Sequence, residues 1–435
     1  MSEFAIGRKA GEPSRAGIDF DLVVRSVLFV AMLLLVWVSP QPFQSLADPP
    51  AATSDGGNRI NQIVFALAFL ALGGWAWLNG TSRFRPLLRP LMLLTIAWFA
   101  LSVLTSWEPL LSARRLIFTL MVIAMAAVML LLPRNVRHFA DLLAAAALAV
   151  IALSYLGVAL APSLSIHQAT DFLEPEHAGN WRGVFPHKNQ AGAMMAIFVF
   201  VGLFVARMRS LALGWVIVAA AVVFLVLTKS KTPTGLLPLA LIATWFIARL
   251  RRPALGVAIA AGMVALFNLF SIGSVYFEPV LEILKATMSD PSFTGRSDIW
   301  KFALGELATR PITGFGFSAF WGTERVVFGL SEQGTWATAA TDAHNAYLNL
   351  AITTGVPGLA LAAIWLVALP LLDFYRRSDD PQSRPLALFF LRVWLLGLMM
   401  ASFESILFPQ VGEVWFIFII AVFGLRYLTQ ARAAA

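Results

Sequence analysis

The chain has 435 residues, of which 59% are apolar and 13% are charged, and it carries a formal net charge of +8. Soluble domains contain about 45–50% apolar and about 25% charged residues, so this composition excludes an ordinary soluble protein and indicates a polytopic membrane protein. Cysteine is absent, which excludes disulfides, thiolate metal sites and thiol nucleophiles. Nucleic acid is not an expected partner, because the positive charge is not gathered on the face of a soluble fold.

Apolar runs of about 20 residues, long enough to cross a bilayer, recur along the chain. They predict an all-α integral membrane protein with about 12 transmembrane helices. A polar tail, 1–18, is expected to be disordered and cytoplasmic, and 19–435 is expected to form one polytopic membrane domain. The first run lacks a small-residue cleavage site, so it is expected to remain as a helix. The runs lie near 22–39, 63–79, 90–106, 116–133, 141–160, 190–206, 211–227, 235–249, 254–272, 346–372, 386–403 and 411–428.

Basic residues gather in one set of short connections between these runs, for example at Arg134, Arg209, Arg251 and Arg377. The positive-inside rule assigns such connections to the cytoplasm. The opposite connections contain more acidic than basic residues, so both termini are expected inside and the long polar segment 273–345 outside. This outer segment is expected to contain short helices.

Arg296 is the first candidate for an anion site on the outer side. The segment SFTGRSDIWKFALGELATR predicts a short amphipathic helix with Thr294 as its N-cap, ending at Arg310. A cation in the first turn opposes the helix dipole, whereas an anion bound there would contact both the guanidinium and the backbone N–H groups. The alternative is a solvated arginine paired with Asp298 or Glu306.

Further cations lie in two other outer connections. Arg182, His187 and Lys188 gather in NWRGVFPHKNQAG, close to the start of a predicted membrane helix, which suits phosphate binding. Lys229 and Lys231 lie in TKSKTPT, beside hydroxyl groups and a proline that interrupts the helix. The alternatives are contact with lipid headgroups for the first cluster and snorkelling lysines for the second.

His344 is the candidate general base, because imidazole titrates near neutral pH and this residue closes the long outer segment at a helix start. Asp342 is close enough in sequence to orient it, or it is only the N-cap of that helix. Asn345, which follows, is a supporting residue.

Other ionisable residues give weaker signals. No His/Glu group with metal-ligand spacing is expected on the outer side, so no metal site is predicted. Asp19 and Asp21, on the inner face, are interpreted as a flank of the first helix, and His138 is assigned to the same face. His167 and His177 lie in a connection without other site-like residues. Arg392, within a predicted span, is expected to pair with Glu404 or Glu413.

The motifs WRGVFPHKNQAG, TKSKTP, TGRSDIWKFALGELATRPITGFGF and HNAYLNLAITTGVPGL in combination resemble the O-antigen ligase/polymerase superfamily of bacterial envelopes. The likeness in motifs covers 180–360, and the number of spans and the long outer segment extend it to the whole chain. The HKN and SKT forms are most similar to exopolysaccharide polymerases of the succinoglycan type.

This resemblance implies a glycosyltransferase of the bacterial inner membrane. It would transfer an oligosaccharide from undecaprenyl pyrophosphate to a sugar hydroxyl on the periplasmic side, polymerising repeat units without metal or other cofactor. Arg182, Lys231 and Arg296 would bind the pyrophosphate, and His344 would activate the acceptor. Lys231 stands where many relatives carry arginine. A lysine ammonium is a point charge and cannot bind a phosphate through two parallel N–H groups as a guanidinium does.

Two other functions stay open from the sequence. An O-antigen ligase would transfer finished polymer to lipid A-core instead of extending it. A transporter or flippase is less favoured, because its charges would be expected near the membrane midplane rather than at the outer mouth. The expected partners are the lipid-linked saccharide, a saccharide acceptor, the bilayer, and chain-length and export proteins.

Overall fold

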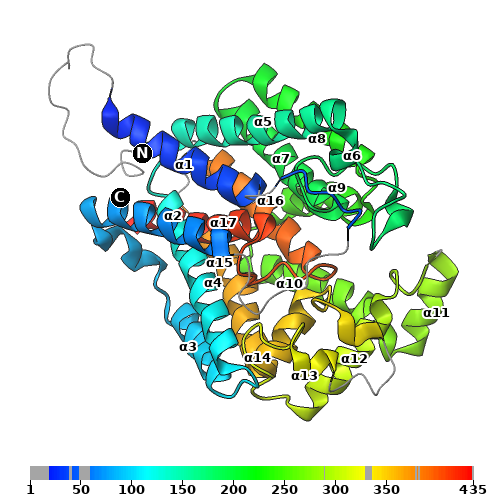
Figure 1. Ribbon diagram of the computed structural model, residues 1–435. Helices are drawn as coiled ribbons and strands as arrows, with labels where there is room; N and C mark the ends of the chain where they lie inside the picture. Colours follow the sequence, from blue (N-terminus) through cyan, green and yellow to red (C-terminus); the bar gives the residue numbers. More distant parts are fainter. Residues whose placement is uncertain are drawn as a thin grey trace.

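The computed structural model describes residues 19–38, 42–48, 59–288, 290–328, 336–377, 380 and 383–433. The expected tail 1–18 lies outside these residues. The described chain is almost entirely helical, and its only extended pairing is a single bridge between Ile166 and Trp181 (Figure 1).

Long helices coincide with the predicted apolar runs. Eight of the described helices are long and apolar enough to cross a membrane, and α3 and α8 are apolar but shorter. The predicted class, an all-α integral membrane protein, is therefore confirmed. The helices that coincide with the predicted runs are α1 (Phe20–Val38), α2 (Arg59–Leu78), α3 (Pro90–Leu104), α4 (Pro109–Met129), α5 (Val136–Leu160), α7 (Lys188–Met208), α8 (Leu211–Leu227), α9 (Lys231–Ile247), α10 (Pro253–Phe270), α14 (Ala346–Ala363), α16 (Ser383–Met400) and α17 (Glu413–Ala433).

Short helices occupy the connections, and several lie in the long segment 273–345, as predicted. They are η1 (Thr81–Leu87), α6 (Pro162–Ser165), η2 (Pro175–His177), η3 (Ile272–Val275), α11 (Glu278–Thr287), α12 (Arg296–Thr309), α13 (Glu324–Val327) and η5 (Trp336–Ala339). After α14, a π-helical turn, η6 (Ile364–Ala368), leads into α15 (Leu369–Arg376).

Helices α7 and α16 form the centre of the bundle, because 78% of the apolar window of each is buried, more than in most other candidate spans. α7 packs closely against α8 where two glycines face each other. A Cβ added at Gly202 would lie 2.7 Å from the carbonyl oxygen of Gly214. Small residues permit such close backbone approach between membrane helices. The helix whose first turn carries a predicted site motif is thus a buried, closely packed element of the bundle.

α12 lies over the start of α14 and forms the second apolar cluster of the molecule. Ile299, Trp300 and Phe302 are buried in this cluster, and the indole N–H of Trp300 donates to the Ala343 carbonyl at 2.9 Å. The predicted N-cap of α12 was wrong. Gly295, with φ of 81°, is the N-cap, and the backbone N–H of Thr294 donates to the Asp290 carboxylate at 2.7 Å.

α14 is interrupted at Gly355, where φ is 75°. The preceding segment fills the break, since the Gly316 N–H donates to the Thr353 carbonyl and the Phe315 N–H to the Ile352 carbonyl. A Cβ at Gly355 would lie 1.8 Å from the Ile312 carbonyl oxygen, so only glycine fits there. The segment GFGF (314–317) is therefore anchored to α14.

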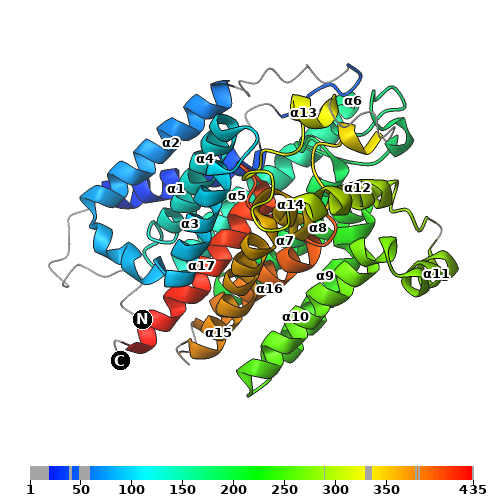
Figure 2. The ribbon, with the colours of Figure 1, turned by 90° about the horizontal axis from the view of Figure 1, so that it is seen from below.

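The two ends of the bundle differ. At one end lie α6 and α13, and at the other the carboxyl ends of α15 and α17 (Figure 2). The second end is tied by ion pairs: Arg134 contacts Asp19 at 2.6 Å and Asp21 at 3.1 Å, and Arg89 pairs with Asp373. Asp19 and Asp21 thus form ion pairs with Arg134, which lies in the connection between α4 and α5.

Candidate functional site

Two of the predicted motifs meet at Asn189, in the first turn of α7. The N-cap of this helix is His187, whose ring Nδ1 accepts the backbone N–H of Asn189 at 3.1 Å. The side-chain oxygen of Asn189 accepts the Ser230 hydroxyl at 2.9 Å, and its Nδ2 donates to Glu404 at 3.2 Å. Asn189 therefore joins the HKNQ and TKSKT motifs to the connection between α16 and α17.

Glu404 in turn joins the other two motifs. Its Oε1 lies 3.0 Å from the Arg296 guanidinium, which also donates to the Phe403 carbonyl. Its Oε2 lies 3.7 Å from Nδ1 of His344, a distance that makes an electrostatic contact rather than a hydrogen bond. The partner of Arg296 is thus Glu404, not Asp298 or Glu306. The ion-pair partner of Glu404 is therefore Arg296 and not Arg392, although Glu404 was one of the two expected partners of Arg392.

Carboxylates surround the His344 ring. Nδ1 lies 3.8 Å from Asp342, in addition to the contact with Glu404. Burial opposes the charged imidazole, but Glu404 and Asp342 outweigh it and raise the pKa of His344. Burial alone would raise the pKa of Glu404, but His344 and Arg296 outweigh it and lower that pKa.

The backbone around His344 is strained but well anchored. Its φ is 46°, a left-handed conformation that non-glycine residues seldom adopt. Asp342 accepts the His344 N–H at 2.7 Å, while Asn345 is the N-cap and accepts the Leu348 N–H at 3.0 Å. The alternative that Asp342 is the N-cap was therefore wrong. Nδ2 of Asn345 also donates to the Ser402 carbonyl at 2.9 Å, which ties α14 to the segment carrying Glu404.

A cavity of about 370 Å³, here named the charged cavity, opens beside this network. The charged or titratable residues of its lining include Arg296, His344, Glu404, Asp342 and His187, and apolar side chains form another part of its wall. The apolar wall includes Met400, Ile406, Val411, Val414 and Trp415. Such a cavity offers charged groups and an apolar surface to one ligand.

Three lysines lie outside the lining of this cavity. Lys188 is half-buried at the start of α7, and Lys229 and Lys231 are exposed. Lys229 and Lys231 lie close enough to Lys188 to repel its charge, and Glu174 lies close enough to attract it. We name these three residues the lysine rim. Their positive charge adds to that of Arg296 at this end of the bundle.

Arg182 is not brought to the cavity. It is 1% exposed, and its guanidinium donates to the carbonyls of Phe185, at 3.1 Å, and Gln44. Burial lowers the pKa of Arg182. In this structure it holds the loop before α7 together, and it does not line the charged cavity.

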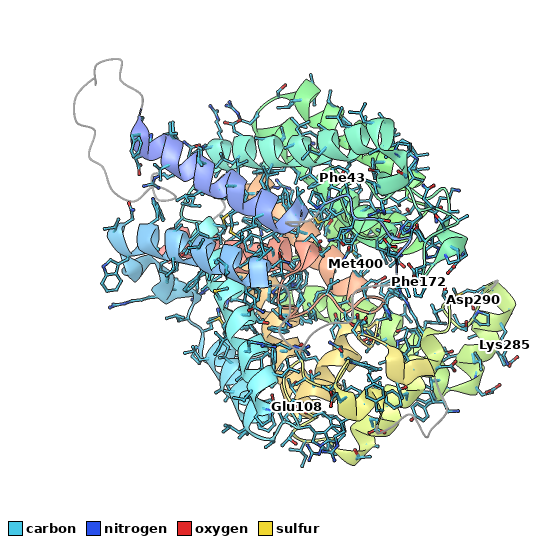
Figure 3. The ribbon with its side chains drawn as sticks, in the orientation of Figure 1. Phe43, Glu108, Phe172, Lys285, Asp290 and Met400 are labelled. Carbon is cyan, nitrogen blue, oxygen red and sulfur yellow. The ribbon has the colours of Figure 1, made fainter. Side chains whose placement is uncertain are left out.

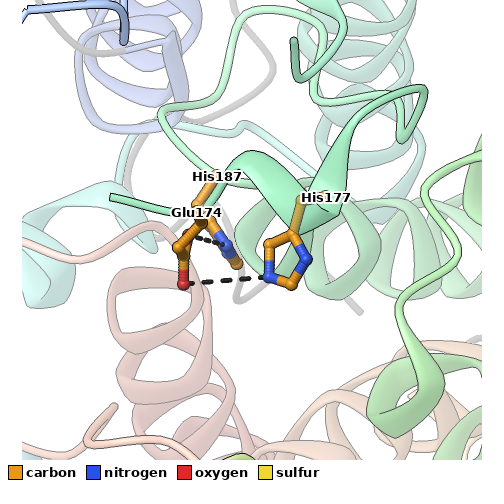
Figure 4. A group of neighbouring side chains, drawn as sticks. All are labelled: Glu174, His177 and His187. Carbon is orange, nitrogen blue, oxygen red and sulfur yellow. Dashed lines mark ion pairs between the residues drawn. The ribbon is translucent and has the colours of Figure 1, made fainter. Parts of the chain in front are cut away.

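Glu174, His177 and His187 form a group that the sequence analysis did not anticipate (Figure 4). One potential ligand atom from each lies within 4.8 Å of the others. His187 Nε2 is 2.9 Å and His177 Nε2 3.7 Å from the Glu174 carboxylate, and the close His187 ring lowers the pKa of Glu174 to about 2. The expectation that no His/Glu group has metal-ligand spacing was therefore wrong.

The hydrogen bonding of His187 disfavours a metal ion in this group. A histidine that binds metal through Nε2 carries its proton on Nδ1 and donates it to an acceptor. Here Nδ1 accepts the Asn189 N–H, so the neutral ring carries its proton on Nε2, which faces Glu174. The donor set fits a close electrostatic contact with Glu174, without a hydrogen bond, better than a metal centre.

Sequence reasoning missed the residues that connect the motifs. Asn189 and Ser230 were quoted within motifs but given no role, and Glu404 was considered only as a partner of Arg392. The usable signal for Glu404 was its position: an acid directly after an apolar run, at the end of the bundle where the predicted site motifs gather.

Residues 216–363 match the family model of O-antigen ligase. The match confirms the predicted resemblance to the O-antigen ligase/polymerase superfamily. It contains Lys229, Lys231, Arg296 and His344, whereas His187 and Glu404 lie outside it. No curated protein matches the chain.

Proposed function

We propose that this member of the O-antigen ligase/polymerase superfamily is a glycosyltransferase of the bacterial inner membrane that polymerises saccharide repeat units on the periplasmic side. Its donor would be an oligosaccharide on undecaprenyl pyrophosphate, and its acceptor a sugar hydroxyl. The observation that carries the proposal is the charged cavity, in which Arg296 and His344 of the matched region converge on Glu404 at one end of a membrane bundle.

Arg296 is the proposed ligand of the pyrophosphate. A guanidinium can bind phosphate oxygens through two parallel N–H groups, and positive charge fixed in advance stabilises a leaving group on which negative charge develops. Glu404 and the Phe403 carbonyl hold the guanidinium at the cavity wall. The apolar side chains that line the same cavity suit the first part of the polyprenyl chain.

The lysine rim makes the site favourable for an anion. The charged cavity is lined by four carboxyl groups, those of Glu174, Asp342, Glu404 and Glu413, so Arg296 alone does not make it positive. Lys188, Lys229 and Lys231 supply three further charges nearby, and in our proposal they attract the pyrophosphate towards Arg296. The ring of His187, which contacts Glu174 at 2.9 Å, also lines the cavity. Arg182 acts in this proposal by positioning the loop rather than by binding.

His344 is the proposed base. With Nδ1 directed towards Glu404 and Asp342, its Nε2 is left to take the proton of the acceptor hydroxyl. The acceptor oxygen then attacks C1 of the donor sugar, the bond from C1 to the pyrophosphate oxygen breaks, and undecaprenyl pyrophosphate leaves. The two carboxylates stabilise the imidazolium as it forms. Asp342 and Asn345 position the ring through their backbone contacts.

The proposed reaction uses no metal ion and no cofactor. Its charge stabilisation comes from Arg296 and the lysine rim, and the only described group with metal-ligand spacing has hydrogen bonds that fit an ion pair better. The expected partners are the lipid-linked saccharide, the acceptor and the bilayer, with chain-length and export proteins acting on the product.

Transfer of finished polymer to lipid A-core is the second candidate function, because the matched family model is described as O-antigen ligase. Deleting the gene and examining the polysaccharide of the cell separates the two functions. Loss of long polymer supports a polymerase. Long polymer that persists on its lipid carrier but is missing from lipid A supports a ligase, and an unchanged profile contradicts both.

A further inference from the structure

A second cavity, of about 270 Å³, adjoins the charged cavity and shares Asp342, Ser405 and Pro409 with it. We name it the polar cavity. The hydroxyl of Ser405, at this boundary, is buried and has no hydrogen-bond partner within the described structure. Because buried polar groups are normally paired, this hydroxyl is available to a ligand that spans the two cavities.

The lining of the polar cavity combines an aromatic ring with uncharged polar groups. The indole N–H of Trp321 donates to Oδ1 of Asn349 at 2.8 Å, and both residues line the cavity together with Thr341, Thr353 and Gln410. This bond fixes the indole and leaves the NH₂ group of Asn349 to donate to a ligand. An amide, hydroxyls and an aromatic ring are the groups that match a sugar, which has hydroxyls at its edge and C–H groups on its faces.

The walls of the polar cavity are rigid. Asn349 and Thr353 lie one turn apart on α14, and the Thr353 hydroxyl donates to the Asn349 carbonyl at 2.8 Å. On the other walls, Ser318 and Phe408 have left-handed φ values of 53° and 55°. The Ser318 carbonyl accepts a hydrogen bond from Arg115. Strained backbone of this kind persists where the surroundings fix it, and it concentrates at ligand sites.

Charge separates the roles of the two cavities. Arg296, His187 and His344 line the charged cavity together with four carboxyl groups, whereas the polar cavity has Arg115, held by the Ser318 carbonyl, and the shared Asp342. The lysine rim lies close to Glu174 of the charged cavity, so its charge and that of Arg296 favour the pyrophosphate there. The polar cavity, with one arginine and one carboxylate, suits an uncharged, hydroxyl-rich group.

We propose that the polar cavity binds a sugar ring and presents it to His344 across the boundary formed by Asp342 and Ser405. The proposal rests on the proposed function, because it takes His344 as the base and Arg296 as the pyrophosphate ligand. The ring belongs either to the acceptor or to the donor saccharide. Both have the same chemistry in the cavity, and binding measurements separate them.

Asn349→Asp tests the proposal with little change of shape. It keeps an oxygen that can accept the Trp321 N–H and removes the NH₂ donor. Thr353→Val removes a cavity hydroxyl, and Thr354→Val is its matched control, since Thr354 is the next residue of α14, donates to the Leu350 carbonyl at 2.8 Å and lines neither cavity. The ligands are the lipid-linked saccharide from cells lacking the protein and sugar-free undecaprenyl pyrophosphate.

We expect Asn349→Asp to weaken saccharide binding about tenfold, as for the loss of one hydrogen bond, Thr353→Val to weaken it less, and Thr354→Val to leave it unchanged. If the ring is part of the donor, affinity for the lipid-linked saccharide falls while affinity for sugar-free undecaprenyl pyrophosphate stays. If the ring is part of the acceptor, both affinities stay and the KM for the acceptor rises.

Unchanged donor affinity together with unchanged acceptor KM in Asn349→Asp and Thr353→Val would overturn the proposal. Equal weakening of both ligands would also overturn it, because it would indicate general damage to the site. Arg296→Ala tests the proposed function separately: sugar-free undecaprenyl pyrophosphate should lose affinity for this variant. Wild-type affinity there would refute the pyrophosphate site, whatever Asn349→Asp does.

Discussion

Glu404 is the residue at which the separate motifs become one site. It contacts Asn189 of α7, Arg296 of α12 and His344 before α14. A half-buried carboxylate with these neighbours keeps the guanidinium in place and favours the charged imidazole. Figure 3 draws the side chains and labels Met400, the last residue of α16. Met400 lines the charged cavity and lies four positions before Glu404 in the sequence.

Glu404→Gln should move the pH dependence of turnover. In the wild type, Glu404 and Asp342 raise the pKa of His344, so the ring loses its proton, and becomes a base, only above its ordinary range. Removing the Glu404 charge lowers that pKa, so the acid limb of kcat should move to lower pH. The measurement is kcat against pH for both proteins.

Glu306→Gln, at a half-buried position on α12 that lines neither cavity, is the control and should keep the wild-type profile. An acid limb of Glu404→Gln that stays in place or moves to higher pH would show that His344 is not the group that titrates.

Arg182→Ala should reduce stability, in contrast to Arg296→Ala. Arg182 is 1% exposed and bonded to two carbonyls, so its removal leaves buried acceptors without donors and costs about 1–3 kcal/mol. Arg296→Ala should leave the protein inserted and abundant but inactive. Thermal unfolding in detergent and the amount of inserted protein measure the difference. Wild-type stability of Arg182→Ala would contradict its role in the loop.

From the sequence, Arg182 and Arg296 looked alike, because both are cations beside a glycine near the start of a helix. What separates them are partners far away along the chain. Gln44 is 138 residues from Arg182, and Glu404 is 108 residues from Arg296. Local chemistry predicted that both mattered, but only the packing of the helices decides which one lines a cavity.

At the scale of elements, the interruption of α14 is where the long segment 273–345 packs into the bundle, because Phe315 and Gly316 donate to α14 carbonyls beside Gly355. Gly355→Ala should destabilise the protein by about 1–3 kcal/mol, because φ is 75° and the new Cβ would meet the Ile312 carbonyl oxygen. Gly262→Ala in α10 is the matched control, since nothing lies within 4 Å of its Cβ position. Thermal unfolding of the two variants is the measurement, and equal midpoints would contradict this role of Gly355.

Sequence patterns predicted the helices well and their first residues less well. Runs of apolar residues set the helices because the bilayer requires them. The N-cap of a helix depends on which nearby polar group accepts the free N–H groups of its first turn. Several neighbouring residues could take this role at the starts of α12 and α14. The N-cap of α12 is Gly295 rather than Thr294, whose backbone N–H donates to Asp290. The N-cap of α14 is Asn345 rather than Asp342, whose carboxylate accepts the His344 N–H.

For the whole molecule, we expect the end with the two cavities to face the periplasm. The opposite end has the basic connections, including Arg134 paired with Asp19 and Asp21. A reporter that is active only outside the inner membrane should therefore be active when fused near Gly322. The same reporter should be inactive near Arg251 and Arg377. The reverse pattern would contradict the orientation and the proposed site of transfer.

The central claim is that the charged cavity transfers a saccharide from undecaprenyl pyrophosphate, and turnover in proteoliposomes tests it most directly. The assay contains purified protein, the lipid-linked saccharide from cells lacking it, and no other enzyme. The wild type should lengthen the saccharide and release undecaprenyl pyrophosphate. Arg296→Ala should lose about a hundredfold or more in rate, and His344→Ala should bind the donor but not react. Wild-type turnover by Arg296→Ala at equal protein would contradict the claim.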